Sequence, residues 1–226
     1  MKRKKALLAL IAAPFLAAAA DVPEHSKRIH ESATVLDEIM AAKDHSIPRD
    51  LLEKAQCVGI VPNLKRAGFV VGGQYGKGVL TCRTEHGAWS APSTIRIEGG
   101  NIGLQIGAGE TDVLFLVMNQ SGMNKLMEDK FTIGAGAAVM AGPVGRSTAA
   151  ETDAFLKAEI LSYSRSHGIF AGVTLDGATL RPDNDDNTKI YGKPVTQREL
   201  LEGHVKAPAS ADPLFAALDR YASRKG

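Results

Sequence analysis

The chain lacks the sequence motifs of the common catalytic sites. It contains no G-x-S-x-G, so the strained turn that carries the serine of α/β-hydrolases is not predicted. His30 and Glu31 begin the pattern of a zinc protease, but Thr34 stands where the second histidine is required. The six histidines are scattered, and no C-x-x-C occurs. We therefore predict a protein that is not an enzyme, with no catalytic residues and no metal site.

Nucleotide-binding loops are also missing, although glycine is abundant. Residues 72–78 read GGQYGKG, in which Gly78 replaces the serine or threonine of a phosphate-binding loop. After the GAG of residues 134–136, Val139 replaces the third glycine of a dinucleotide fingerprint. No nucleotide or other cofactor is expected.

Cysteine is scarce, and acidic residues cluster at one place only. Cys57 and Cys82 form a candidate disulfide if the chain enters an oxidising compartment, and two buried thiols are the alternative. Asp183 to Asp186 lie in the acidic run DNDDN, whose oxygens suit calcium. The EF-hand spacing is absent, so a solvated loop without metal is the other interpretation.

The first 20 residues have the layout of a secretory signal peptide. Four basic residues precede the apolar stretch ALLALIAAPFLAAAA, whose last alanines suit a signal peptidase. A membrane anchor is the alternative, but the stretch contains Pro14 and is shorter than the ~20 residues that a spanning helix needs. We expect cleavage before Asp21 and a periplasmic or secreted product.

Cleavage changes the charge of the protein. The whole chain has 27 basic and 25 acidic residues, and loss of four basic residues leaves 23 and 25, a net charge of −2. A slightly acidic protein has no general attraction for nucleic acid, so anion binding must come from a local group of cations.

Helices are predicted at both ends of the mature chain. Ile29, Ala33, Leu36 and Met40 recur at spacings of four and three, which predicts an amphipathic helix over 24–45. Two interpretations of this helix are open: its apolar face packs on its own domain, or it lies in a lipid interface.

Shorter helices are expected at three further places. Residues 50–55 predict a second helix, Thr196 with Glu199 predicts a capping box, and residues 214–223 predict a terminal helix.

From residue 57 the pattern changes to short apolar runs separated by turn residues. We expect Pro62 to stop the first strand, which places Lys65 and Arg66 in a loop, and Gly76 with Lys77 to form a tight hairpin turn. Short strands with frequent turns predict an antiparallel meander.

Basic residues in the predicted loops are the candidates for binding an anionic surface. Loop lysines and arginines can meet phosphate oxygens without burying charge. Independent solvated charges are the alternative unless the fold gathers them on one face. The candidates for headgroup binding are Lys65, Arg66, Lys77, Lys130 and Arg146.

Four sequence blocks occur in an order and spacing typical of one family. They are CVGIVPNLKRAGFVVGGQYGKGVLTCR, WSAPSTIRIEGGNIGLQIGAGETDVLFLVMN, KFTIGAGAAVMAGPVGR and SYSRSHGIFAGVTLDGATL. Residues 57–191, which contain them, closely resemble the SYLF domain family. The resemblance implies phospholipid binding without catalysis, and actin regulation in fungal and animal members.

We therefore predict an α+β fold, with a strongly curved, mainly antiparallel sheet that approaches a barrel and N-terminal helices packed against it. Residues 1–20 form the signal peptide, 21–206 the SYLF-like domain, and 207–226 a linker with a short helix.

The predicted function is non-catalytic binding of anionic phospholipid, or a membrane surface, in the cell envelope. An envelope scaffold that binds protein without lipid is the alternative. A secreted chain does not meet cytoplasmic actin, so actin is not expected as a partner.

Overall fold

The computed structural model describes residues 24–42, 46–69, 71–102, 107–133, 139–145, 155, 157–166, 169–172 and 177–223. The expected signal peptide and Arg146 lie outside these residues.

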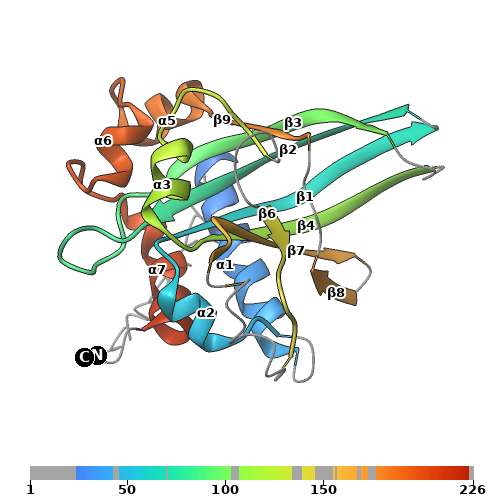
Figure 1. The fold of residues 1–226 in the computed structure, drawn as a ribbon. Helices are drawn as coiled ribbons and strands as arrows, with labels where there is room; N and C mark the ends of the chain where they lie inside the picture. Colours follow the sequence, from blue (N-terminus) through green and yellow to red (C-terminus); the bar gives the residue numbers. More distant parts are fainter. Residues whose placement is uncertain are drawn as a thin grey trace, which may run out of the picture.

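Helices precede and follow one sheet along the chain (Figure 1). The helices are α1 (Glu24–Ala41), α2 (Arg49–Lys54), α3 (Gln120–Leu126), α5 (Asn184–Tyr191), α6 (Gln197–Leu201), the 3-10 helix η2 (Ala209–Ala211) and α7 (Asp212–Ala222). The strands are β1 (Cys57–Phe69), β2 (Val71–Cys82), β3 (Ser93–Ile102), β4 (Gly107–Val117), β5 (Phe131–Thr132), β6 (Val139–Ala141), β7 (Ile160–Ser166), β8 (Ile169–Gly172) and β9 (Thr179–Pro182).

The described strands form one mainly antiparallel sheet in the order β5-β9-β3-β2-β1-β4-β7-β6, with β8 paired to β7. Only β6 and β7 pair in parallel among these strands. Strands β1 to β4 are the long ones, and one end of them extends beyond the helices (Figure 1). We call this end, formed by residues 64–69, 71–75, 98–102 and 107–112, the distal end of the sheet.

Apolar side chains cover both faces of the sheet at its other end. On the outer face, α1, α2 and α7 pack on strand residues such as Val58, Ile60 and Leu114. On the inner face, α3 and residues from both sides of the sheet, such as Ile97 and Phe115, share a second cluster. Because β9 and β7 both contribute to this inner cluster, the sheet must curl around it, which confirms the predicted curved α+β fold.

Close packing on the inner face depends on one glycine of β1. Gly59 pairs with Phe115 of β4, and a Cβ atom at residue 59 would lie 2.0 Å from Phe115 Cζ. The missing side chain therefore provides the space that the phenyl ring fills.

Locally encoded features agree with the sequence. α1 and α2 lie where periodicity predicts them, and Thr196 and Glu199 form the expected capping box of α6. At the start of α3, the Asn119 side chain accepts a hydrogen bond from the Gly122 N–H and caps the helix. No described helix is both long and apolar enough to cross a membrane.

The predicted loop and turn in the first hairpin are wrong. β1 continues through Pro62, so Lys65 and Arg66 are strand residues. β2 runs without a break from Val71 to Cys82, so Lys77 lies within a strand and not at a hairpin tip. Pro62 is tolerated because a bulge interrupts the ladder at this point.

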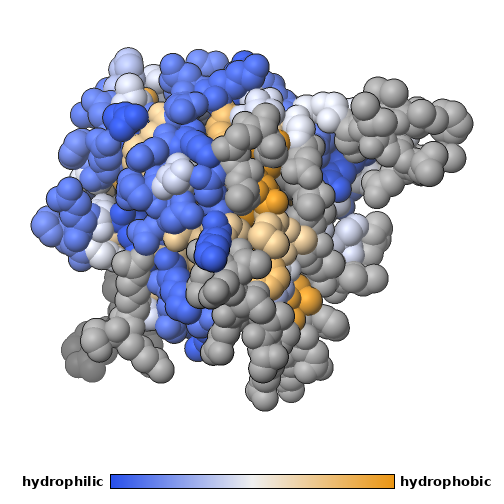
Figure 2. Space-filling view, in the orientation of Figure 1, coloured by the Kyte–Doolittle hydropathy of each residue, from blue (hydrophilic) through white to orange (hydrophobic). Residues whose placement is uncertain are grey.

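The surface of the molecule differs from one region to another. Figure 2 shows mainly hydrophilic side chains over α3, α5 and α6, and apolar side chains over β6 and β7. Val139 and Met140 of β6 are half-buried there and pack against the two cores.

Candidate functional site

A bulge in β1 decides which face each basic residue occupies. Val61 pairs with Val113 of β4, whereas Leu64 pairs with Thr111, so β1 contains one extra residue between these pairs. Asn63 takes a positive φ of 52°, and its N–H donates to Asp112 Oδ1 at 2.9 Å. Without the extra residue, every later side chain of β1 would point to the opposite face.

Lys65 lies on the outer face of the distal end, opposite Tyr75 of β2. Tyr75 is 46% exposed, and no other large hydrophobic side chain among the described residues is exposed. Lys65 contacts Glu110 at 3.8 Å, but the two side chains are 72% and 58% exposed, so this ion pair is weak. The distal end therefore presents an aromatic ring beside a cation that is free to change partners.

Arg66 lies on the inner face, opposite Gln74 of β2. It follows Leu64 of the inner core by two residues, and alternate residues of a strand share a face. Lys65 and Arg66 therefore point away from each other and cannot bind one surface together.

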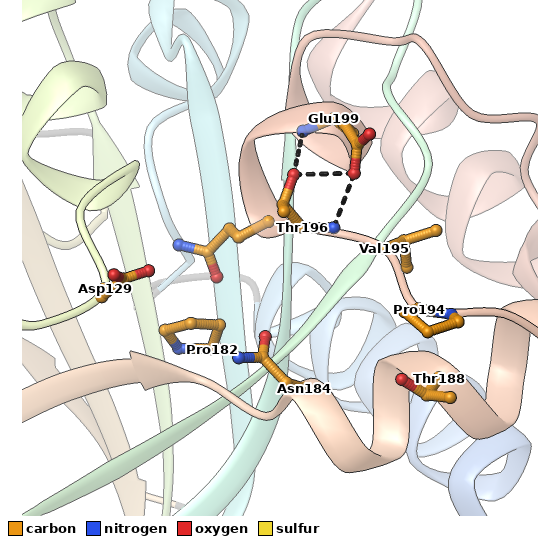
Figure 3. Close-up of a pocket in the computed structure, with 9 residues that line it drawn as sticks. Asp129, Pro182, Asn184, Thr188, Pro194, Val195, Thr196 and Glu199 are labelled. Carbon is orange, nitrogen blue, oxygen red and sulfur yellow. Dashed lines mark hydrogen bonds between the residues drawn. The ribbon is translucent and has the colours of Figure 1, made fainter.

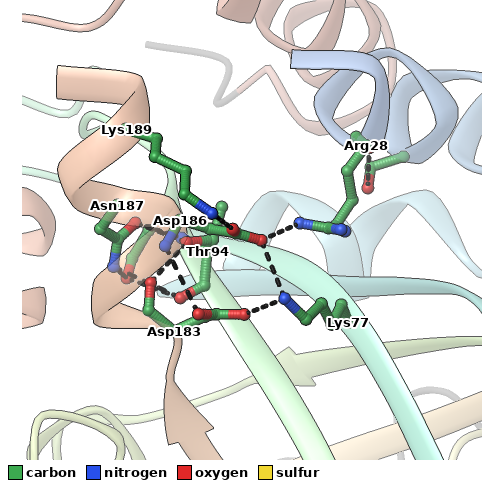
Figure 4. A network of polar contacts seen from close by, with 9 residues as sticks. Arg28, Lys77, Thr94, Asp183, Asp186, Asn187 and Lys189 are labelled. Atoms are coloured by element: carbon green, nitrogen blue, oxygen red, sulfur yellow. Dashed lines mark hydrogen bonds and ion pairs between the residues drawn. The ribbon is translucent and has the colours of Figure 1, made fainter. Parts of the chain in front are cut away.

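Lys77 belongs to an ion-pair network that joins β2 to α1 and α5 (Figure 4). Its Nζ lies 2.7 Å from Asp183 Oδ2 and 3.1 Å from Asp186 Oδ2, and Arg28 Nη1 lies 2.8 Å from the same Asp186 oxygen. Lys189 completes this group, which we call the Asp186 network, at 3.4 Å from Asp186 Oδ1.

The Asp186 network holds its charges in place. Burial alone would raise the pKa of Asp186, but hydrogen bonds and charges from Lys77 and Arg28 outweigh it and lower the pKa to about 2. Burial would likewise lower the pKa of Lys77, yet hydrogen bonds to Asp183 and Asp186 raise it. Lys77 is thus already paired, which argues against its predicted contact with headgroups.

The acidic run is not a solvated loop. Asp183 caps α5 by accepting from the Asp186 N–H, and both side chains are buried. Asn187 Oδ1 accepts from the N–H of Thr94 at 2.7 Å, which fixes α5 against β3. In the described part of the chain, no group of three or more metal-ligating side chains comes together.

Lys130 is exposed and lies directly before β5 at one edge of the sheet, four strands from β1 in the sheet order. The described candidates are therefore divided: Lys65 and Lys77 share the outer face, Arg66 faces inward, and Lys130 lies at the sheet edge, three strands from Lys77.

Cys57 and Cys82 are directly opposite in the β1–β2 register, with Cα atoms 3.9 Å apart. The two residues form a disulfide in the structure. The bond ties the two central strands at the end opposite the distal end.

The pocket beside α5 and α6 is acidic in character (Figure 3). It has a volume of about 290 Å³ and is lined by Asp129 and Glu199 together with Pro182, Pro194 and Val195. No lysine or arginine lines it. This pocket is therefore unsuited to an anionic headgroup.

A second pocket of about 290 Å³ lies between α1 and the β1 bulge. Its half-buried cation, Arg165, is held by Asp112 at 2.6 Å and by Glu38. The arginine is thus committed to linking α1 to β4 and β7, and the pocket offers no unpaired buried charge.

Sequence reasoning missed Tyr75, Gln74 and the role of the bulge. Once β1 and β2 are aligned with one extra residue after Pro62, Lys65 and Tyr75 fall opposite each other. The signal for this was Pro62 followed by Asn63, a residue that tolerates positive φ.

Sequence comparison relates the chain to known proteins. The family described as "Ysc84: Las17-binding protein actin regulator" matches residues 98–221, more than half of the 226 residues. "LAS seventeen-binding protein 3" of Saccharomyces cerevisiae is 37% identical over 182 residues, which are 79% of this chain and 39% of that protein. "SH3 domain-containing YSC84-like protein 1" of Homo sapiens is 31% identical over 182 residues, 80% of this chain and 53% of that protein.

The chain thus spans only about two fifths to one half of the length of these relatives. Their names describe binding and regulation and not catalysis. The matched region contains β4, α3, β7 and the acidic members of the Asp186 network, Asp183 and Asp186, and the match to the relatives extends over about four fifths of the chain. By this shared sequence the chain belongs to the Ysc84 family of SYLF-domain proteins.

Proposed function

We propose that this protein binds anionic phospholipid surfaces without catalysis, through the outer face of the distal end. The observation that carries the proposal is the pair of Lys65 and Tyr75, which lie side by side on strands that the helices leave uncovered.

The two side chains suit a membrane surface for different reasons. Tyrosine rings are favoured at the level of the headgroups, where one end is apolar and the other is wet. A lysine near an anionic surface contributes about 1 kcal/mol.

We also propose that the protein acts in the cell envelope or outside the cell. The signal-like residues 1–20 support this location, and a disulfide between Cys57 and Cys82 is suited to an oxidising compartment.

Protein binding is the second candidate function. It is favoured by the names of the relatives, which describe Las17 binding and actin regulation. A scaffold of this kind retains a partner in a pull-down without any lipid, whereas the lipid proposal predicts retention on vesicles of pure phospholipid.

Vesicle sedimentation tests the lipid proposal. The purified chain, with and without residues 1–20, is mixed at low salt with vesicles of phosphatidylcholine alone or with added phosphatidylglycerol. We expect sedimentation only with the anionic vesicles, and Lys65→Gln should weaken it roughly fivefold, as about 1 kcal/mol requires.

Tyr75→Ser should weaken sedimentation as well, because it removes the aromatic anchor. Lys193→Gln is the matched control, because this exposed lysine follows α5, away from the distal end. Absence of wild-type sedimentation with anionic vesicles contradicts the proposal. Equal weakening by Lys193→Gln would show that net charge matters and not this surface.

A further inference from the structure

Four residues form a row across the inner face of the distal end. Gln74 of β2 pairs with Gly99 of β3 on one side and with Arg66 of β1 on the other. Arg66 in turn pairs with Gly109 of β4. The row therefore reads Gly99, Gln74, Arg66, Gly109, with two polar side chains between two glycines.

The two polar side chains have no partners in the described part of the protein. Arg66 is half-buried, and its Nε is shielded from solvent without a hydrogen bond. Gln74 is only 7% exposed, and no hydrogen bond of its side-chain amide is found. A buried donor without an acceptor is costly, so the shielded Nε of Arg66 calls for a ligand.

Arg66 and Arg96 differ from other shielded arginines of the described chain, because neither has a hydrogen bond or an ion pair there. Arg28 and Arg165 each contact a carboxylate at less than 3 Å, and Arg83 donates to backbone carbonyl oxygens. Among the described residues, no carboxylate forms an ion pair with Arg66. Burial lowers the pKa of its guanidinium.

The glycines decide from which side a ligand can approach. A Cβ atom at Gly99 would lie 3.0 Å from the Gly177 carbonyl oxygen, so the backbone of residues 177 and 178 closes that side. A Cβ atom at Gly109 would have no neighbour within 4 Å, and Gly109 is exposed. Thr111, on the same face and next to this open space, could add its hydroxyl.

We propose that Arg66 and Gln74 form a binding site for a single phosphate-type oxyanion, which enters over Gly109. A guanidinium presents its N–H groups as a fork that matches two phosphate oxygens, and the amide of Gln74 adds further donors. The site lies on the opposite face from Lys65 and Tyr75. A lipid headgroup or free phosphate supplies the same chemistry, and only the lipid source rests on the proposed function.

Calorimetric titration of the full chain tests this site with two probes, inorganic phosphate and dihexanoyl phosphatidic acid below its micelle concentration. We expect the wild type to bind at least one of them and Arg66→Gln to weaken that binding at least tenfold. Arg66→Lys keeps the charge but not the fork, so it should restore only part of the affinity.

Lys193→Gln is the matched control, since it removes an exposed charge that follows α5, away from the distal end, and should leave these affinities within twofold. Binding of both probes with similar affinity indicates a free-phosphate site, and binding of the lipid alone indicates a headgroup site. If neither probe binds the wild type, or if Lys193→Gln is as damaging as Arg66→Gln, the inference is wrong.

Folding and vesicle binding separate the possible failures. Because Arg66 has no described partner, Arg66→Gln should melt at the same temperature as the wild type or higher, whereas a structural arginine would lower it. If the wild type binds a probe in the titration but does not sediment with anionic vesicles, only the proposed function is overturned. If the wild type sediments with anionic vesicles but binds neither probe in the titration, only the oxyanion site is overturned.

Discussion

At the scale of single residues, missing side chains shape this protein as much as present ones. Gly59 leaves room for the Phe115 ring, and Gly142 does the same for Tyr163, whose ring atoms lie within 2.4 Å of the position of a Cβ atom. Gly109, in contrast, faces open space at the distal end. Glycines at one end of the sheet therefore serve packing, and Gly109 at the other leaves an approach open.

Replacing Gly59 should destabilise the protein. Gly59→Ala introduces a methyl group where Phe115 Cζ lies 2.0 Å away, and such overpacking costs about 1–3 kcal/mol. Denaturant unfolding measures the loss. Gly73→Ala is the control, because a Cβ atom there meets only a carbonyl oxygen at 4.0 Å.

A second substitution identifies the cause. Phe115→Leu in the Gly59→Ala background should recover part of the stability, because the smaller side chain makes room for the methyl group. No recovery, or equal damage by Gly73→Ala, contradicts the packing explanation.

At the scale of elements, the Asp186 network docks α1 and α5 on the sheet. Arg28 comes from α1, Lys77 from β2, and Asp186 from α5, so one carboxylate joins three elements that are distant in sequence (Figure 4). Removing one partner of such a buried group leaves uncompensated charge on the others.

The network predicts how stability depends on pH. The pKa of Asp186 is lowered from 3.8 to about 2 on folding. Its contribution is therefore fully present above pH ~4 and is lost as the pH falls toward 2, a change of about 2 kcal/mol. Asp186→Asn should reduce stability at pH 7 and flatten this acid dependence, as measured by urea unfolding at pH 7, 4 and 3.

Asp185→Asn is the control for this experiment. Asp185 is its exposed neighbour in the same turn of α5, outside the Asp186 network, so its replacement should leave the pH dependence nearly unchanged. If the stability of Asp186→Asn falls with acid as steeply as that of the wild type, other carboxylates are responsible for the pH dependence.

Elements whose signals are local could be predicted from the sequence, and long-range contacts could not. The spacing of Ile29, Ala33 and Leu36 encodes α1, and Thr196 with Glu199 encodes the start of α6. Pro62 misled the strand prediction, because its effect depends on the neighbouring strands that accommodate the bulge. The partners of Lys77 lie more than 100 positions away, and no local pattern announces them.

At the scale of the whole molecule, the sheet has a packed end and a bare end. Two cores and the Cys57–Cys82 bond lie at the packed end, and Lys65, Arg66 and Tyr75 lie at the bare one. The sequence thus identified Lys65 and Arg66 as candidate basic residues. Which face of the sheet each one occupies could be seen only from the register of β1.

The expected export of the chain is testable in a bacterial host. We expect the complete chain to be recovered outside the cytoplasm with Asp21 as its first residue, as measured by fractionation and intact mass. Ala20→Arg places a large charged residue at the cleavage position and should block processing, because signal peptidase needs small residues there. An uncleaved wild-type chain retained in the cytoplasm contradicts the prediction.

The length of β1 beyond its bulge has a mechanical consequence. Eight residues of β1 follow Val61, and at ~3.3 Å each they extend the strand by roughly 25 Å. Lys65, the proposed lipid contact, lies four residues or roughly 13 Å beyond Val61, so a bilayer bound there would stand off from the helices at the packed end. The acidic pocket beside α5 and α6 then remains clear of the lipid, and a load on the tip acts on the body through a long lever arm.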